Sequence, residues 1–181
     1  MLFKEYINGI NHSLRFPDSM PAPMYLGLGI MGEGGELVQK LYSPASNLED
    51  IIKEAGDVLW YISMFLRETG CTLFDVMGTD NFADAYITMQ DTVTVKDNPV
   101  EDFALQCLLL SEHFKKVARD NNSQVHVRII EIKGTLYHII RHLLLILIMY
   151  KLDITEVLQT NIDKLQKRKK DNTIQGDGDN R

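Results

Sequence analysis

Two pairs of acidic residues in this 181-residue sequence have the side-chain type and the spacing of a metal site. Glu33 and Glu36 form the first pair, and Glu54 and Asp57 form the second. Residues three apart share one face of a helix, and both pairs lie in apolar stretches that are typical of helices. Carboxylates on core-facing helices repel one another and are costly to bury unless a cation neutralises them. Because oxygen ligands suit hard ions, these four acids predict a Mg²⁺ site on two facing helices, which Mn²⁺ could also occupy.

Glycines within both acid segments distinguish them from an ordinary solvated helix face, which is the alternative for either pair alone. Gly34 and Gly35 lie inside the first pair, and Gly56 lies inside the second. Each glycine lowers helix stability by about 1 kcal/mol relative to alanine. Since glycine in a helix usually admits a neighbouring backbone or a ligand, we expect close approaches at these positions.

The composition is that of an ordinary globular protein, and it argues against several function classes. A net charge of -6 disfavours non-specific binding of nucleic acid, which needs a basic surface. The two cysteines, Cys71 and Cys107, provide neither a disulfide framework nor metal-like spacing, which favours a reducing cytoplasm. The first residues also lack the long apolar core of a signal peptide.

Residues 136–150 are the most apolar stretch of the chain, and a membrane span is one interpretation of them. The stretch is too short for a span, and His138, Arg141 and His142 interrupt it. We therefore expect a buried helix here and no membrane partner. The spacing of His138 and His142 also allows a zinc site, although no zinc-binding motif surrounds them.

The hydrophobic periodicity predicts an all-α helical bundle that forms a single domain over residues 1–181. We expect helices over residues 3–14, 24–41, 48–68, 73–77, 100–119, 125–151 and 154–170. Residues 46–49 look like a capping signal for the third of these helices. Residues 78–99 are polar and are expected to form an irregular linker, in which 86–89 and 92–95 could be short extended pieces, and residues 171–181 a polar tail.

Two halves of the chain resemble one another. Residues 51–62 align without gaps with residues 129–140, and shorter matches flank them on both sides. The alignment places Leu109, Glu112, Ile132 and Thr135 opposite Glu33, Glu36, Glu54 and Asp57. A tandem pseudo-repeat of helical hairpins explains this pattern, with a catalytic repeat over 24–77 and a second repeat over 100–170 that lacks most metal ligands. Chance similarity between amphipathic helices is the alternative. The repeat predicts one metal site per chain and leaves a homodimer open.

The two acid motifs and a C-terminal motif together resemble a known family. The segment from Gly27 to Leu37, with the segment from Glu54 to Tyr61, is similar to the ExxE and ExxD motifs of the MazG-like all-α nucleoside triphosphate pyrophosphohydrolases. Residues 161–168 resemble the family's Asn-x-x-Lys-Leu-x-x-Arg motif. The resemblance covers residues 25–77 and 154–181.

The resemblance implies a fold, an activity and a set of site residues. It implies an all-α fold and Mg²⁺-dependent cleavage of a nucleoside triphosphate to the monophosphate and pyrophosphate. Four residues would hold metal, namely Glu33, Glu36, Glu54 and Asp57. Four others would contact substrate, namely Tyr61, Asn161, Lys164 and Arg168. Many family members carry an additional acid where this chain has Gly32, so the number of metal ions stays open.

The expected chemistry needs a metal and a proton acceptor. A bound metal polarises the α-phosphate and lowers the pKa of a water, and a carboxylate that is not fully engaged with metal takes the proton. Glu33 and Glu36 are both candidates for that carboxylate, and the sequence does not choose between them.

The substrate and the class of function leave alternatives. Deoxynucleoside or non-standard triphosphates are the expected substrates, a dUTPase- or dCTPase-like specificity is the next interpretation, and a phosphoribosyl-ATP hydrolase is less well supported. A non-catalytic nucleotide-binding regulatory protein is the alternative from another class. The basic run over residues 164–170 could bind nucleic acid but is better explained as a solvated helix end.

Overall fold

A computed structural model describes residues 1–11, 16–91, 98–120 and 124–171. Within these ranges the protein is all-α, and its one β-type pairing is an isolated bridge between Leu2 and Asn81. The helices are α1 (Phe3–Ile10), α2 (Ala22–Tyr42), α3 (Leu48–Glu68), α4 (Phe74–Met77), α5 (Phe82–Gln90), α6 (Pro99–Asp120), the 3₁₀ helix η2 (Val125–Arg128), α7 (Ile129–Met149) and α8 (Ile154–Lys170). The predicted helical bundle is therefore confirmed. Residues 12–14, 92–95 and 172–181, for which the sequence predicted helix, extended chain and tail, lie outside the described residues.

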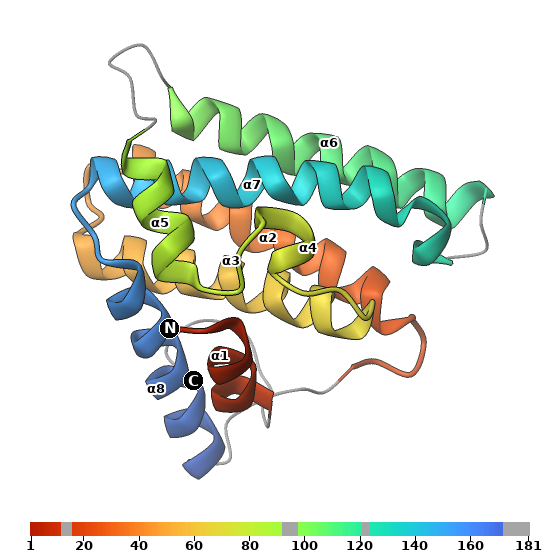
Figure 1. The fold of residues 1–181 in the computed structure, drawn as a ribbon, viewed down its shortest axis with the longest axis horizontal. Helices are drawn as coiled ribbons and strands as arrows, with labels where there is room; N and C mark the ends of the chain where they lie inside the picture. The colour runs from red at the N-terminus through yellow and green to blue at the C-terminus, as the bar shows by residue number, and fades with distance from the viewer. Residues whose placement is uncertain (12–15, 92–97, 121–123, 172–181) are drawn as a thin grey trace.

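Two helical hairpins form the centre of the molecule. Helix α2 packs against α3, α6 packs against α7, and the two hairpins meet mainly along α2 and α6. Helix α8 lies across α3 and contacts α1, so that α1 and α8 form a separate edge of the bundle (Figure 1). The two halves that the internal repeat predicted thus pack face to face.

Glycines on α2 explain why the hairpins meet along this seam. A Cβ atom on Gly27 would lie 2.0 Å from the ring of Phe114, and one on Gly34 would lie 2.7 Å from the Cys107 sulfur. Both neighbours belong to α6, so only glycine allows the two helices to approach so closely. Gly35, in contrast, has nothing within 4 Å of a built Cβ, and the close approach expected there is absent.

The buried hydrophobic residues of the described chain belong to one cluster. The residues predicted to pack between the halves are all buried in it, namely Leu59, Ile62, Phe65, Leu136, Ile139, Ile140 and Leu143. Helices α3 and α7, which carry them, touch one another, but the more extensive seam runs between α2 and α6.

The prediction of an irregular linker over residues 78–99 is wrong for its central part, which forms α5. The Asn81 side chain caps this helix by accepting a hydrogen bond from the Ala83 backbone. Phe82, Ala85 and Met89 form its buried face, and this helical spacing is hidden in the sequence by the polar residues between them. Residues 86–89, for which the sequence allowed a short extended piece, are therefore helical.

The capping signal before α3 lies one residue later than predicted. Asn47, and not Ser46, is the N-cap, because its side chain accepts from the Asp50 backbone at 3.0 Å. The Asp50 carboxylate accepts in return from the Asn47 backbone at 3.1 Å. This reciprocal pair is a capping box with asparagine and aspartate in place of the more common residues.

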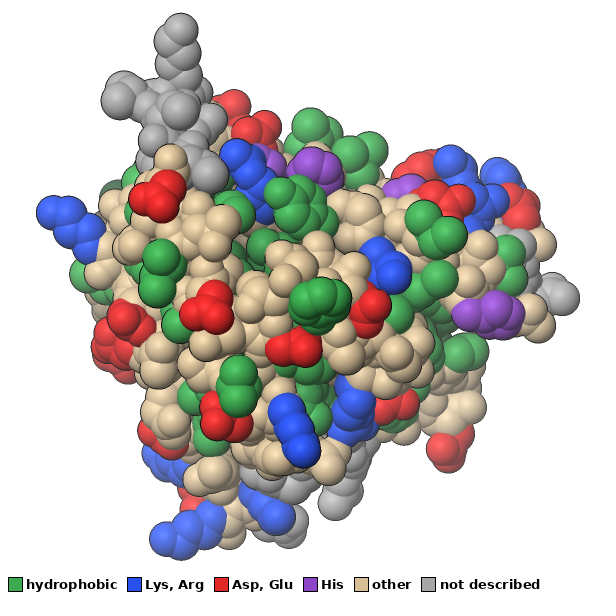
Figure 2. Space-filling model, viewed as in Figure 1, with side chains coloured by type: hydrophobic (Ala, Val, Ile, Leu, Met, Phe, Trp, Pro, Cys, Tyr) green, Lys and Arg blue, Asp and Glu red, His purple; other side chains and the backbone are tan. Residues whose placement is uncertain are grey.

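One helical stretch, Val125–Met149, is long and apolar enough to cross a membrane, but 61% of its most apolar window is buried inside the protein. This burial agrees with the expectation of a core helix, as found in soluble proteins. The face of the molecule drawn in Figure 2 carries acidic, basic and hydrophobic side chains interspersed with one another, and neither sign of charge dominates it.

Candidate metal centre

Three of the four predicted metal ligands meet between α2 and α3. Oxygen atoms of Glu33, Glu36 and Glu54 all lie within 4.8 Å of one another. Glu54 is only 2% exposed, Glu33 is partly buried and Glu36 is exposed, so the group opens towards solvent at one side. In the described part of the chain, this is the one group of at least three metal-ligating side chains.

The electrostatics of this group fit a cation. Burial, followed by the charges of Asp57, Glu36 and Glu54, raises the pKa of Glu33 to about 8, while Lys164 acts in the opposite direction. The Lys40 ammonium also lies nearby, with its Nζ atom 3.9 Å from a Glu54 oxygen. A hard divalent ion ligated by these oxygens would relieve the repulsion, so the residues present fit Mg²⁺ or Mn²⁺.

Asp57, the fourth predicted ligand, is held by α8. Its Oδ2 atom lies 2.5 Å from Nζ of Lys164, and its Oδ1 atom accepts a hydrogen bond of 2.8 Å from the Asn161 amide. Asn161 and Lys164 are three positions apart and therefore share the face of α8 that points at α3. Two residues predicted to bind substrate thus contact a predicted metal ligand.

Tyr6 extends this network into α1, and sequence reasoning missed it. Its hydroxyl donates a hydrogen bond of 2.8 Å to the side-chain oxygen of Asn161. Tyr6 is fully buried, and burial together with the charge of Asp57 raises its pKa well above the usual value. On α3, a Cβ atom on Gly56 would lie 3.0 Å from the Cβ atom of Asn161. The absence of a side chain at Gly56, where the sequence predicted a close approach, therefore lets α8 pack closely against α3.

The other two residues predicted to bind substrate are Tyr61, which lies beside the acids, and Arg168, which is largely covered by protein. Tyr61 lies against α2, where a Cβ on Gly29 would be 2.0 Å from its ring, and it is hydrogen-bonded to Tyr25. Burial, this hydrogen bond and the charges of Glu33 and Asp57 raise the pKa of Tyr61, as expected for a residue facing the acids. Arg168 is 9% exposed, so protein covers most of its surface.

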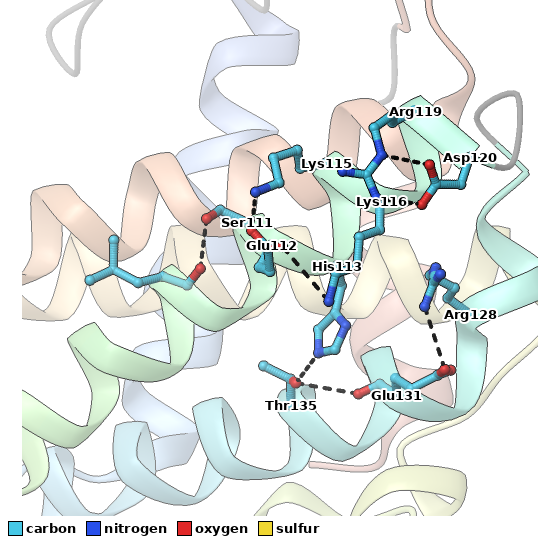
Figure 3. A network of polar contacts seen from close by, with 11 residues as sticks. Ser111, Glu112, His113, Lys115, Lys116, Arg119, Asp120, Arg128, Glu131 and Thr135 are labelled. Carbon is cyan, nitrogen blue, oxygen red and sulfur yellow. Dashed lines mark hydrogen bonds and ion pairs between the residues drawn. The ribbon is translucent and has the colours of Figure 1, made fainter.

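The corresponding positions of the second hairpin are occupied differently (Figure 3). Thr135, opposite Asp57 in the repeat, contacts the His113 Nε2 atom at 3.0 Å. Glu112 pairs with Lys115 and, at 3.7 Å, with Lys116. Glu131 pairs with Arg128 at 3.8 Å, and Ile132 is completely buried. Among the described residues, this hairpin contains no group of three or more ligating side chains, and the single metal site per chain remains a prediction.

The histidines considered for zinc lack a third ligand at short range within the described ranges. The rings of His138 and His142 stack with their centroids 6.4 Å apart. The Nδ1 atom of His142 lies 4.0 Å from an Asp102 oxygen, but His138, His142 and Asp102 do not form a group of three ligating atoms in the described part of the chain.

Comparisons with protein-family models, with curated proteins and with solved structures find no match for this chain.

Proposed function

We propose that this protein is a Mg²⁺-dependent pyrophosphohydrolase that cleaves nucleoside triphosphates to the monophosphate and pyrophosphate. The observation that carries the proposal is the grouping of Glu33, Glu36 and Glu54 beside the Asp57–Lys164 pair. Carboxylates that can hold a metal thus lie next to an ammonium that can bind phosphate, which is the combination that a magnesium–triphosphate complex needs.

Each residue of this arrangement has a role in the proposed reaction. Glu33, Glu36 and Glu54 would hold the ion, which supplies polarisation of the α-phosphate and a more acidic bound water. Lys164 would neutralise phosphate charge as a mobile point charge, and Asn161 would orient Asp57. Tyr61 borders the acids and would contact the substrate sugar or phosphate.

Glu33 is the better candidate for the proton acceptor. In the ion-free protein, burial and the neighbouring acids raise its pKa to about 8, so that most of it is protonated at pH 7; a divalent ion bound beside it would favour the ionised form that accepts a proton. A base whose pKa lies near the operating pH can accept a proton from an activated water and release it again. We assign Glu36, which is exposed, to metal ligation alone, whereas Glu33 would use one carboxylate oxygen for the ion and keep the other for the proton.

The choice of substrate class rests on the resemblance to the MazG-like superfamily. Deoxynucleoside or non-standard triphosphates in the cytoplasm are the proposed substrates, and a dUTPase- or dCTPase-like preference is the nearest variant. The same acid group would also allow nucleotide binding without turnover, which defines the regulatory alternative.

The decisive experiment measures pyrophosphate and phosphate release from a panel of ribo-, deoxy- and modified nucleoside triphosphates with Mg²⁺. We expect pyrophosphate and monophosphate from at least one member, and no release by the Glu54→Gln protein. Release of orthophosphate with a diphosphate product would contradict the proposed bond cleavage. Nucleotide binding without any product, by folded protein that binds Mn²⁺, would favour the regulatory alternative.

A further inference from the structure

The carboxylate of Asp57 is held by two arms that differ in charge and accessibility. The Asn161 amide, which holds Oδ1, is 3% exposed and is itself fixed by the hydroxyl of Tyr6. The Lys164 ammonium, which holds Oδ2 at 2.5 Å, belongs to a side chain that is 13% exposed at the edge of the acid group. The neutral Asn161 amide is therefore fixed in the core, whereas the Lys164 ammonium stands at the end of a flexible aliphatic side chain.

Asp57 is not one of the three acids whose oxygens lie within 4.8 Å of one another, but a divalent ion that recruited it as a further ligand would compete with the Lys164 ammonium for Oδ2. Asp57 raises the pKa of Glu33 through its charge and Lys164 lowers it, so both lie within electrostatic range of the acid group. An ion held by Glu33, Glu36 and Glu54 that also used Oδ2 of Asp57 would place two positive centres around one carboxylate oxygen. Like charges at such a separation repel strongly, so the ammonium and the ion exclude one another there.

We propose that Lys164 is a built-in counter-cation of Asp57, which leaves Oδ2 when a divalent ion binds and then binds a phosphate of the substrate. This inference rests on the proposed function and adds a coupling to it. In the ion-free protein, Lys164 offsets the charge of an otherwise repulsive group of acids. When the ion takes over that role, the ammonium becomes available to the triphosphate, so metal binding and phosphate binding support one another.

The test is Lys164→Met, which keeps the length of the stem and removes the ammonium. Two dissociation constants are measured, that of Mn²⁺ by electron paramagnetic resonance and that of inorganic pyrophosphate by calorimetry at saturating Mn²⁺. We expect Mn²⁺ to bind about tenfold more tightly and pyrophosphate about tenfold more weakly, the size of one charge-assisted hydrogen bond. Opposite signs for the two ligands are the signature of the exchange, because a purely structural lysine would weaken both.

Lys40→Met is the matched control for electrostatic attraction alone. Its ammonium lies 3.9 Å from Glu54 and its side chain is 37% exposed, so removing it also makes the group more negative but breaks no short contact. We expect its effect on the Mn²⁺ dissociation constant to be clearly smaller than that of Lys164→Met. Equal effects of the two substitutions, or no effect of either, would overturn the exchange while leaving the metal centre intact. Absence of Mn²⁺ binding in every variant and in the unmodified protein would overturn the metal centre and the proposed function with it.

A second measurement uses the unmodified protein and so does not depend on the folding of a variant. Reductive methylation followed by mass spectrometry reports how accessible each lysine amine is. We expect Mg²⁺ together with pyrophosphate to leave Lys164 protected, and Mg²⁺ alone to increase its methylation rate. Lys53, paired with Glu49 at 2.8 Å on the surface, should react at the same rate throughout. An unchanged or reduced rate for Lys164 with Mg²⁺ alone would refute the proposal.

Discussion

The Tyr6 hydroxyl donates a hydrogen bond of 2.8 Å to the Asn161 side-chain oxygen, and the nitrogen of the same amide donates to Asp57. The two contacts together fix which way the amide faces, since its oxygen must accept and its nitrogen must donate. A buried residue near the start of the chain thereby orients a carboxylate beside the candidate metal centre. Outer contacts of this kind commonly decide how well a site holds its ion.

We predict that Tyr6→Phe weakens Mn²⁺ binding by about tenfold, because Asn161 is then no longer held in the orientation that Asp57 needs. The phenyl ring preserves the edge-on contact with Phe82 at 5.8 Å, so the packing of α1 is kept. Titration with Mn²⁺ measures the effect. Unchanged affinity would mean that the hydroxyl contributes only to stability.

Tyr86→Phe is the matched control for that substitution. The Tyr86 hydroxyl donates a hydrogen bond of 2.9 Å to the Leu152 backbone oxygen, away from the acid group. Both substitutions should lower the free energy of unfolding by about 1 kcal/mol through the loss of one hydrogen bond. Only the substitution of Tyr6 should also change the affinity for Mn²⁺.

Neutralising two neighbouring acids should have opposite effects on the stability of the ion-free protein. Glu33→Gln removes a carboxylate that burial and like charges disfavour, so we expect the free energy of unfolding at pH 7 to rise by about 1–2 kcal/mol. Asp57→Asn places an amide nitrogen or a neutral oxygen against the Lys164 ammonium, and we expect a loss of about 1–3 kcal/mol. Urea unfolding without divalent ions decides this, and the same sign for both variants would contradict the geometry.

The raised pKa of Glu33 predicts how stability depends on pH. The folded protein holds the proton up to about pH 8, whereas the unfolded chain releases it near pH 4.5. The contribution of Glu33 to the free energy of unfolding is therefore fully present below pH 4.5, and it is lost as the pH rises towards 8. Allowing for solvent screening, the loss is on the order of 2 kcal/mol. Denaturation of ion-free protein from pH 4.5 to 8 measures it, and the Glu33→Gln protein should lack this component.

Two glycines of α2 should respond in opposite ways to alanine. Gly27→Ala would place its Cβ 2.0 Å from the Phe114 ring, and we expect a loss of about 2 kcal/mol or more as α2 and α6 are forced apart. Gly35→Ala meets nothing within 4 Å, and the better helix propensity of alanine should raise stability by up to about 1 kcal/mol. Thermal unfolding of the two variants gives the comparison, and stabilisation by Gly27→Ala would show that the seam is looser than described.

Local patterns in the sequence were sufficient to predict much of the fold. The bounds of α3 and α8 match the expected ranges, because apolar periodicity, a capping pattern and a following glycine or charged run are properties of neighbouring residues. The spacing of Glu33 with Glu36 was enough to place both on one helix face. The repeat likewise predicted two hairpins that pack together, since equal apolar patterns bury equal faces.

Helix α5 and the partners of Asp57 were decided by the tertiary structure. The buried face of α5 is sparse in the sequence, and burial against α7 and α8 selects the helix there. Tyr6 and Asn161 are 155 positions apart, so no local pattern joins them, and they meet only because α1 packs on α8. Helical spacing fixes which carboxylates share a face of one helix. The packing of α8 on α3 determines that an amide and an ammonium face Asp57, while Glu33, Glu36 and Glu54 form the group that can hold an ion.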